Sequence, residues 1–547
     1  MSPPIRPSPP ATGADLVLTG GRVWAGLGLP PATAVAAAGG RIVALGSDHD
    51  VSGCIGPATR RVDLRGRLVV PGFNDAHVHF LSGGFGLLSV DLRDARSEAE
   101  LARRVRDHAA ALPAGTWILR GQWDHESWPS RRLPDRGLVD EATPRHPVLL
   151  SRLDGHMSLA NSLALRLGGV TRDTPDPPGG VIARGAGGEP TGILKDRAQE
   201  LVLRAVPEPS RERNRAAARA ALKEAARLGV TTVQDDSPID ALPAYQDLRA
   251  RGELTARLSV WRPIAVLEAL TAAGVRSGLG DEWIRLGPLK LLADGSLGAA
   301  TAALFEPYAD ESGHRGLLLY PEDELERLVL AADAAGFHLA VHAIGDRANA
   351  VVLDAFERAV GRNAPRRRRL RIEHAQVVRA GDLARYRSLG VIASVQPSHC
   401  VDDMRWAERR LGAHRAQDAY RLRSFAAAGI PLAFGSDWYV EPLDPRLALY
   451  GAVARARPEG EQTWCPEEAL TLEQALDAHT RGSAYAEWAE HEKGTLELGK
   501  LADMSVFARD ILALPPREIL TTPVEVTVVG GRVVYEAGAG GTAEGTQ

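Results

Sequence analysis

Residues 69–80 have the sequence Val69-Val70-Pro71-Gly72-Phe73-Asn74-Asp75-Ala76-His77-Val78-His79-Phe80, from which the rest of the chain can be interpreted. The apolar run Leu68 to Val70 predicts a buried strand that ends at Pro71-Gly72. In an extended chain alternate side chains share a face, so His77 and His79 should point the same way, about 6.6 Å apart. Imidazoles at that spacing can bind one metal ion. A single pair is weak evidence, so a metal site requires ligands at the ends of other strands.

The composition is that of a globular protein with roughly two to four domains in 547 residues. The net charge of −4 gives no reason to expect nucleic acid or an anionic membrane as a partner. Three widely spaced cysteines provide no disulfide framework, which favours a cytoplasmic location. No apolar run reaches the roughly 20 residues of a membrane span. Residues 1–13, rich in proline and serine, are predicted to be a disordered leader.

Short strands are predicted at both ends of the chain, over residues 14–18, 41–45, 503–507, 524–529 and 532–535. Because chain termini commonly lie near each other, residues 14–66 and 491–540 are expected to form one small β-sandwich. Two separate β-hairpins remain an alternative.

An alternation of strands and helices follows, and it predicts a (β/α)₈ barrel in the α/β class. The barrel comprises residues 67–80 as its first strand and residues 210–490 as the remainder. Residues 81–209, which contain predicted strands of their own at Trp117–Arg120 and Val148–Arg152, are interpreted as an inserted subdomain over the barrel mouth. The predicted barrel strands are Leu68–Val70, Val230–Gln234, Leu258–Trp261, Leu286–Leu292, Phe337–His342, Leu370–His374, Val391–Gln396 and Ile430–Phe434.

Polar residues occupy the ends of several predicted strands, where the chemistry of such barrels is found. Each alone has an ordinary interpretation, as a hydrogen-bonded core histidine or an aspartate that caps a helix. Together they predict a metal centre. They are His77 and His79 on the first strand, Lys290 on the fourth, His342 on the fifth, His374 on the sixth and Asp437 on the eighth.

Lys290 stands out because the chain carries 65 Lys+Arg but places lysine only at positions 195, 223, 290, 493 and 500. Its leucine neighbours at 289, 291 and 292 should desolvate the amine and favour its neutral form. A neutral amine can add carbon dioxide, and the resulting carbamate has two oxygens that can bridge two cations. Arginine cannot do this. The alternative is a buried ion pair with Asp294, four residues further on.

These residues resemble the amidohydrolase superfamily, and more narrowly its YtcJ-like branch, which includes N-substituted formamide deformylases. The resemblance implies a (β/α)₈ barrel, a β-sandwich formed by both termini and a binuclear metal centre, usually zinc. It implies that His77, His79 and Asp437 hold one metal, that His342 and His374 hold the other, and that N6-carboxylated Lys290 bridges them. The matching motifs are Pro71-Gly72-Phe73-x-Asp75-x-His77-x-His79, Lys290 with Asp294-Gly295-Ser296-Leu297-Gly298, His342-Ala343-x-Gly345-Asp346, Glu373-His374 and Gly435-Ser436-Asp437.

The chain departs from the family pattern at Ala299-Ala300 and at Tyr439, next to the expected site, so the substrate is not implied. Candidate substrate contacts are Trp123, Asp154, His156, His399, Trp438 and Tyr439. For the tryptophans, packing within the insertion is an equally good interpretation. His399 has two interpretations, as an oxyanion donor or as support for the metal ligands.

The predicted reaction is hydrolysis of a C–N bond in a small molecule, such as an amide, an N-formyl group or a cyclic amide. Two cations roughly 3.5–4 Å apart share a hydroxide, and water bound in this way has a pKa of about 7. The hydroxide attacks the carbonyl carbon, and Asp437 transfers a proton to the leaving nitrogen.

Three other functions remain open at this point. The first is a mononuclear heterocycle deaminase, or a lactone or carbamate hydrolase, of the same superfamily. The second is a non-enzymatic binding protein on the same scaffold. The third is nucleic-acid binding through Arg366-Arg367-Arg368-Arg369-x-Arg371, although a solvated loop is the expected role of that run. A homo-oligomer is compatible with the sequence.

Overall fold

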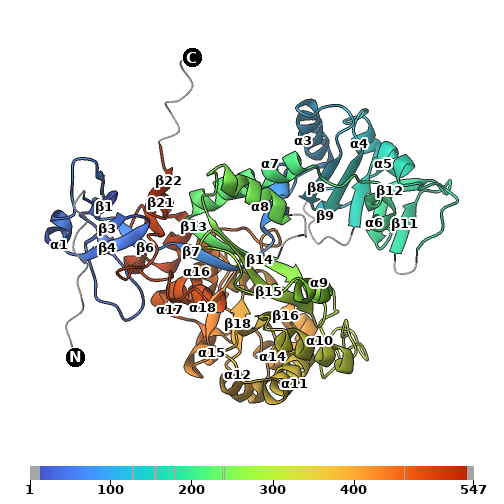
Figure 1. Cartoon of the computed structure of the whole chain (residues 1–547). Coiled ribbons are helices and arrows are strands. Elements are labelled where there is room, and N and C mark those ends of the chain that lie inside the picture. The colour runs from blue at the N-terminus through green and yellow to red at the C-terminus, as the bar shows by residue number, and fades with distance from the viewer. Residues whose placement is uncertain are drawn as a thin grey trace. The chain divides into compact units, whose positions relative to one another are not determined.

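The computed structural model describes residues 13–125, 128–152, 157–177, 180–236, 238, 241–460 and 462–538. The chain divides into two compact units, one formed by Met1–Phe80 with Leu222–Gln547 and the other by Leu81–Ala221 (Figure 1). Of the predicted leader, only Gly13 lies within the described residues. Among the described helices, none combines the length and apolar character needed to cross a bilayer.

The larger unit contains an eight-stranded parallel sheet in which the strands follow one another in chain order. The first and last strands meet through two backbone hydrogen bonds, from the Asp437 N–H to the His77 carbonyl (2.7 Å) and from the His79 N–H to the Trp438 carbonyl (2.6 Å). The predicted barrel is thereby confirmed. Its strands are β7 (Phe73–Val78), β13 (Val230–Asp235), β14 (Arg257–Pro263), β15 (Ile284–Leu292), β16 (Leu339–Ala343), β17 (Leu370–His374), β18 (Ile392–Val395) and β19 (Leu432–Phe434).

One barrel strand was placed wrongly by the sequence. Leu68–Val70 was predicted to be the first barrel strand, but β6 (Leu68–Pro71) pairs with strands of a separate β-sheet, and the barrel strand is β7. Both segments are fully buried, and β6 is the more apolar of the two, which is why the apolar pattern selected the wrong one. β6 ends at Pro71, as predicted, and Gly72 joins it to β7 of the other sheet.

The barrel strands are almost continuously buried because both faces of a parallel barrel are covered. Helices follow the strands, and α11 (Asp346–Arg362) buries Ala348, Val352, Phe356 and Ala359 at helical spacing. Other long helices of this unit include α8 (Ala241–Ala250), α10 (Glu322–Ala334), α14 (Ala407–Ala416) and α16 (Pro445–Ala454). Shorter helices include α9 (Leu267–Ala272), α12 (Leu383–Leu389), α13 (Pro397–Asp403), α15 (Leu422–Ala427), α17 (Leu472–Asp477), α18 (Ser483–Ala486) and α19 (Pro516–Thr521).

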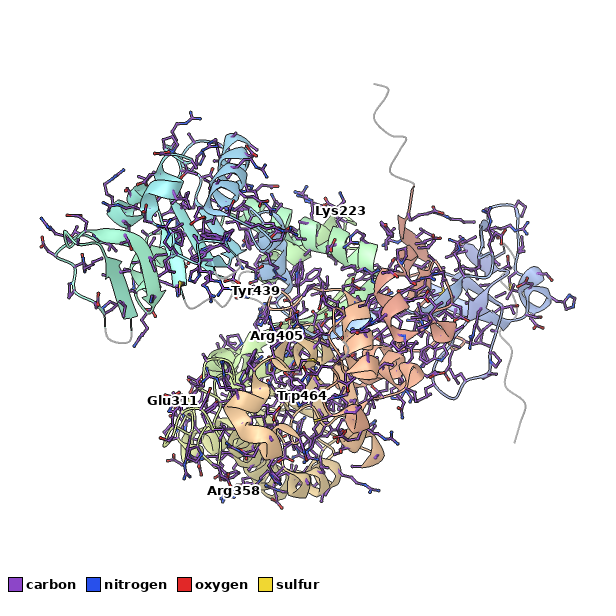
Figure 2. All side chains as sticks on the ribbon, turned by 180° about the vertical axis from the view of Figure 1, so that it is seen from behind. Lys223, Glu311, Arg358, Arg405, Tyr439 and Trp464 are labelled. Atoms are coloured by element: carbon purple, nitrogen blue, oxygen red, sulfur yellow. The ribbon has the colours of Figure 1, made fainter. Side chains whose placement is uncertain are left out.

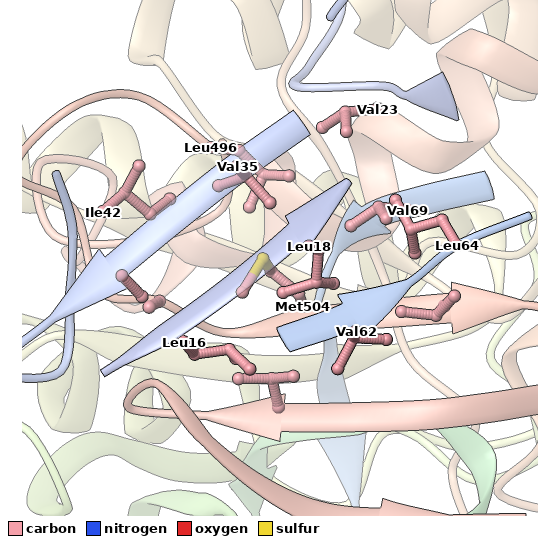
Figure 3. Close-up of a cluster of buried hydrophobic side chains, with 14 of the residues drawn as sticks. Leu16, Leu18, Val23, Val35, Ile42, Val62, Leu64, Val69, Leu496 and Met504 are labelled. Carbon is pink, nitrogen blue, oxygen red and sulfur yellow. The ribbon is translucent and has the colours of Figure 1, made fainter. Parts of the chain in front are cut away.

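Strands from both ends of the chain share a sheet, as the sequence predicted. This sheet has the order β2-β6-β20-β21-β22, with β2 (Arg22–Val23), β20 (Met504–Phe507), β21 (Val524–Val529) and β22 (Arg532–Glu536). A second sheet has the order β4-β3-β1-β5. Side chains of both sheets, including Leu16, Val69 and Met504, form one buried cluster (Figure 3). The strands of the second sheet are β1 (Leu16–Thr19), β3 (Ala34–Ala38), β4 (Arg41–Gly46) and β5 (Arg60–Asp63).

The smaller unit has its own five-stranded sheet, with the order β11-β12-β10-β9-β8. Its strands are β8 (Ile118–Trp123), β9 (Val148–Arg152), β10 (Met157–Ala160), β11 (Gly180–Arg184) and β12 (Pro190–Asp196). Its helices include α3 (Glu98–Ala110), α4 (Arg136–Asp140), α5 (Ser162–Leu167) and α6 (Gln199–Leu203). A separate hydrophobic core, with Trp123 and Trp128 among its members, explains how this segment folds compactly.

Candidate metal centre

Donor side chains from different barrel strands meet at the carboxyl ends of the strands. His77 and His79 end β7, His374 ends β17, and Asp437 follows β19. Within the part of the chain that the structure describes, two sets of three residues have ligand atoms that all lie within 4.8 Å of one another, and both sets include His77. The first set is His77, His374 and Asp437, and the second is His77, His79 and Asp236.

The backbone is strained where two of these residues turn into the site. His374 and Asp437 have φ angles of 72° and 56°, in the left-handed region that favours glycine. Such conformations cost about 1–3 kcal/mol each and are concentrated at functional sites. Gly435 allows the last strand to approach the first, because a Cβ atom there would lie 2.5 Å from the His77 nitrogen. The strained backbone at the rim therefore places these side chains in the site, and the strain costs stability.

Neighbouring side chains fix which ring nitrogen of each histidine faces the site. Nδ1 of His77 lies 2.8 Å from Oε2 of Glu373, which can only accept, so the Nδ1–H donates and Nε2 is left unprotonated. Nδ1 of His374 lies 2.8 Å from Oε1 of Gln396. Nδ1 of His79 lies 2.6 Å from the Asp236 carbonyl oxygen. In all three histidines Nε2 is therefore available as a ligand.

The electrostatics of the cluster suit a cation. Burial and the charge of Lys290 lower the pKa of His77, and they lower the pKa of His342 to about 4. Burial and neighbouring His342 hold the pKa of His374 well below its usual range. Burial alone would raise the pKa of Asp437, but neighbouring His79 and His77 hold it well below the usual value.

The residues present fit a divalent metal ion. Metal ligands must be neutral imidazoles and ionised carboxylates, and the lowered pKa values above favour those forms. His79 differs, because burial alone would lower its pKa but the hydrogen bond and charge of Asp437 raise it, so metal binding there would displace a proton. In addition, among the described residues Oδ1 of Asp437 is buried without a hydrogen bond of good geometry, although Nε2 of His79 lies only 3.1 Å away. A buried carboxylate oxygen without such a bond is costly unless another group binds it.

Lys290, on β15, points into this cluster. Its Nζ lies 3.0 Å from Oδ2 of Asp236 and 3.3 Å from Nε2 of His77. The alternative prediction was a buried ion pair with Asp294. Lys290 does form an ion pair, but with Asp236 rather than Asp294. The Asp294 carboxylate instead accepts three backbone N–H groups of the neighbouring loops, from Ala303, Ile344 and Gly345. The lysine amine is ion-paired, and its partner Asp236 belongs to the second candidate ligand set.

His342 lies beside the two candidate ligand sets but in neither of them. Its ring centroid is 4.5 Å from that of His374. Its Nε2 lies 3.0 Å from the Gly295 carbonyl oxygen and 3.4 Å from Oδ1 of Asp294. The other ring nitrogen, Nδ1, is the atom left for a ligand role.

The predicted substrate contacts have different surroundings. His399 has a buried Nε2 for which the described residues offer no hydrogen-bond partner, 4.0 Å from Oδ2 of Asp437. Tyr439 is 42% exposed, with its ring 6.0 Å from that of His79 (Figure 2). Trp438 is mostly buried, and its ring packs edge-on against Phe80.

The three candidates in the inserted unit give less support to substrate contact. Trp123 is fully buried in the core of that unit, and its Nε1–H donates to the Leu150 carbonyl oxygen. These surroundings support the packing interpretation of Trp123. Asp154 and His156 lie outside the described residues.

The sequence predicted no role for three residues of the site, although Glu373 belongs to one of the matching motifs. Asp236 belongs to a ligand set, and Glu373 and Gln396 orient His77 and His374. Asp236 could have been found, because Asp235-Asp236 directly follows the predicted strand Val230–Gln234. The orienting residues could not, because their roles depend on contacts between different strands.

The arginine run lies in the loop before β17 and in the first residues of that strand, but it is solvated only at Arg367, so the prediction of a solvated loop is wrong for the other four side chains. Arg366 and Arg368 both pair with Asp333, whose side chain is fully buried. Arg369 pairs with Glu490. Inside the barrel, Arg371 pairs with Glu373, and the Nε to Oε1 distance is 2.6 Å. These cations are engaged within the fold, which removes the observation that suggested nucleic-acid binding.

Comparison with known proteins gives consistent matches over nearly the whole chain. A model described as "Amidohydrolase family" matches residues 60–535. Protein LONG AFTER FAR-RED 3 from Arabidopsis thaliana is 38% identical over 536 residues, which are 95% of this chain and 92% of that protein. Putative amidohydrolase YtcJ from Bacillus subtilis (strain 168) is 32% identical, over 88% of this chain and 91% of that protein. N-substituted formamide deformylase from Arthrobacter pascens is 30% identical, over 92% and 95%.

Among solved structures, an uncharacterized metal-dependent hydrolase from Pyrococcus furiosus has a TM-score of 0.76 and 29% identity, over 91% of this chain and 99% of that chain. The resemblance inferred from the sequence motifs is confirmed by these matches. The chain belongs to the amidohydrolase family.

Proposed function

We propose that this protein is a metal-dependent hydrolase that cleaves a C–N bond of a small molecule, in an amide, an N-formyl group or a cyclic amide. The observation that carries the proposal is the meeting of His77, His79, His374 and Asp437 at the carboxyl ends of the barrel strands, with Lys290 among them. The similarity to an N-substituted formamide deformylase supports the choice of bond.

Two divalent metal ions, zinc in this proposal, would be held by the residues of the site. His77, His79 and Asp437 would bind one ion, and His342 and His374 would bind the other. Lys290, carboxylated on its amine, would supply oxygens to both. When bound, such ions polarise a carbonyl oxygen and make water acidic enough to deprotonate near neutral pH.

The side chains of the site account for the proton transfers. The Asp437 carboxylate takes a proton from water and passes it to the leaving nitrogen, because an amide nitrogen leaves poorly unless it is protonated. The buried Nε2 of His399 has no hydrogen-bond partner in the part of the chain that the structure describes, and it lies 4.0 Å from Oδ2 of Asp437, where it can donate to a substrate oxygen. The exposed ring of Tyr439, near His79, supplies a substrate contact.

The proposal is tested by metal analysis of the purified protein together with a rate screen. The screen compares N-formyl amines, N-acetyl amines, cyclic amides, lactones and amino-substituted heterocycles. Two metal ions per chain and hydrolysis of an N-acyl compound are expected. One metal ion per chain with release of ammonia from a heterocycle would favour the deaminase. Turnover of lactones alone would mean that the enzyme cleaves a C–O bond rather than a C–N bond.

Replacing Asp437 by Asn should abolish most turnover while the protein stays folded. The amide cannot accept the proton from water, and a positioned general base is typically worth about 10²- to 10⁴-fold in rate. Initial rates would be measured together with thermal unfolding and metal content. A near-normal rate in the folded, metal-loaded variant would exclude Asp437 from proton transfer.

A further inference from the structure

Asp236 has a fixed position at the rim of the barrel, although the ligand set proposed above does not include it. It directly follows β13, and its backbone N–H donates to the Val78 carbonyl oxygen at 2.8 Å. Its own carbonyl oxygen lies 2.6 Å from Nδ1 of His79. Both backbone groups are thus bonded to the end of β7, beside the two histidines of the His-x-His motif.

The Asp236 side chain points toward the same histidines. It is 19% exposed, and its ligand oxygen lies within 4.8 Å of ring nitrogens of both His77 and His79. Two imidazole nitrogens and one carboxylate oxygen are a frequent donor set in catalytic zinc sites, which keep a further position open.

We propose that Asp236 is a ligand of the metal centre, completing with His77 and His79 a three-donor site for a divalent cation. The inference rests on the proposed function, since it assumes that the cluster binds metal. The position of Lys290 supports it, because its Nζ lies within reach of Oδ2 of Asp236 (3.0 Å) and Nε2 of His77 (3.3 Å). Unmodified, the amine lies where a cation would contact both atoms, and carboxylation of the amine, as proposed above, would free them for the metal.

A simpler role for Asp236 is to neutralise the charge of Lys290. The two roles give opposite expectations once the lysine is removed. If Asp236 is only a counter-ion, it has no effect on metal affinity in a Lys290→Gln protein. If Asp236 is a ligand, its removal weakens metal binding whether or not the lysine is present.

The experiment is a titration with Zn²⁺ and Co²⁺ against a competing chelator, using the full-length wild-type protein, Asp236→Asn, Lys290→Gln and the double variant. Zn²⁺ affinity should fall by more than about 100-fold on adding Asp236→Asn in either background, because even residues that only orient ligands are worth 10- to 100-fold. The visible absorption of bound Co²⁺ should also change, since it reports the coordination geometry.

Asp235→Asn is the matched control. The Asp235 carboxylate is fully buried one residue away and accepts the Phe80 N–H and the Tyr245 hydroxyl, but it is in neither candidate ligand set. The Zn²⁺ affinity of the Asp235→Asn protein should stay within about threefold of the wild-type value, as expected for a residue whose side chain neither binds the metal nor orients a ligand ring. Asp236→Glu, which keeps a carboxylate, should retain more affinity than Asp236→Asn, and thermal unfolding verifies that each variant is folded.

Equal Zn²⁺ affinities in Lys290→Gln and the double variant would overturn the ligand role and leave Asp236 as a counter-ion. The proposed function would stand in that case, since the wild-type protein would still bind metal. A wild-type protein that binds neither Zn²⁺ nor Co²⁺ would overturn the proposed function, and the ligand role of Asp236 with it.

Discussion

Replacing Glu373 by Gln should weaken metal binding although Glu373 is not expected to touch a metal. Oε2 of Glu373 accepts the Nδ1–H of His77 at 2.8 Å, and both side chains are almost completely buried. This bond keeps Nε2 of His77 unprotonated, and both candidate ligand sets use His77. An amide at position 373 can present an N–H to Nδ1 instead, which would move the ring proton to Nε2 and block the metal.

The size of the effect follows from the role of such partners. Residues that orient a metal-binding histidine typically contribute 10- to 100-fold to affinity, which is about 1.4 to 2.8 kcal/mol. The same change removes the partner of Arg371, whose guanidinium is fully buried and donates to both Glu373 oxygens. Breaking a buried ion pair costs about 3–5 kcal/mol, so the metal-free variant should also unfold more easily.

Chelator competition gives the metal affinity, and urea unfolding of the metal-free protein gives the stability. Glu490→Gln is the matched control, because Glu490 pairs with Arg369 just before β17, about 16 Å of strand from His374. The control should lose stability but keep its metal affinity. Wild-type metal affinity in a folded Glu373→Gln protein would refute the claim that Glu373 sets the state of the His77 ring.

Two further predictions concern the fold. Gly435→Ala should impair barrel closure, because the new Cβ would lie 2.5 Å from the His77 nitrogen. The variant should therefore show reduced soluble expression or a lower unfolding temperature. An unchanged unfolding temperature would contradict the tight contact. Burial alone would raise the pKa of Asp333, but hydrogen bonds from Arg368 and the charge of Arg366 hold it below the usual value. The stabilisation is therefore present above the unfolded-state pKa of about 3.9 and is lost as pH falls through the lower folded-state value. Asp333→Asn should lower the free energy of unfolding by about 3–5 kcal/mol at pH 7. Near pH 3, urea unfolding should show a smaller difference between the wild-type protein and the variant. A difference that does not depend on pH would argue against the pairing of Asp333 with Arg366 and Arg368.

The barrel was predictable because its strands contain enough apolar residues to be recognised and are regularly separated by helices. The one misplaced strand, β6, shows the limit of that reasoning. Leu68–Pro71 and Phe73–Val78 are both completely buried, and the pairing of β6 with β2 and β20 assigns it to the other sheet. Such pairing is set by contacts between the two ends of the chain.

The candidate metal ligands were predictable, but their partners were not. Asp294 has the spacing for an ion pair with Lys290, yet its carboxylate accepts three backbone N–H groups, and Lys290 pairs with Asp236 instead. The proton on each histidine ring depends in the same way on residues from other strands, such as Glu373 beside His77. Spacing along one strand therefore identifies candidates, while contacts across the barrel decide what each does.

The measurement that bears most directly on the proposed centre is anomalous X-ray scattering at the zinc edge from crystals of zinc-loaded protein. We expect two peaks about 4 Å apart, in contact with His77, His79, His374 and Asp437, and extra density on the Lys290 amine between them. A single peak, or none within reach of these side chains, together with an unmodified Lys290 still paired with Asp236, would contradict the binuclear centre.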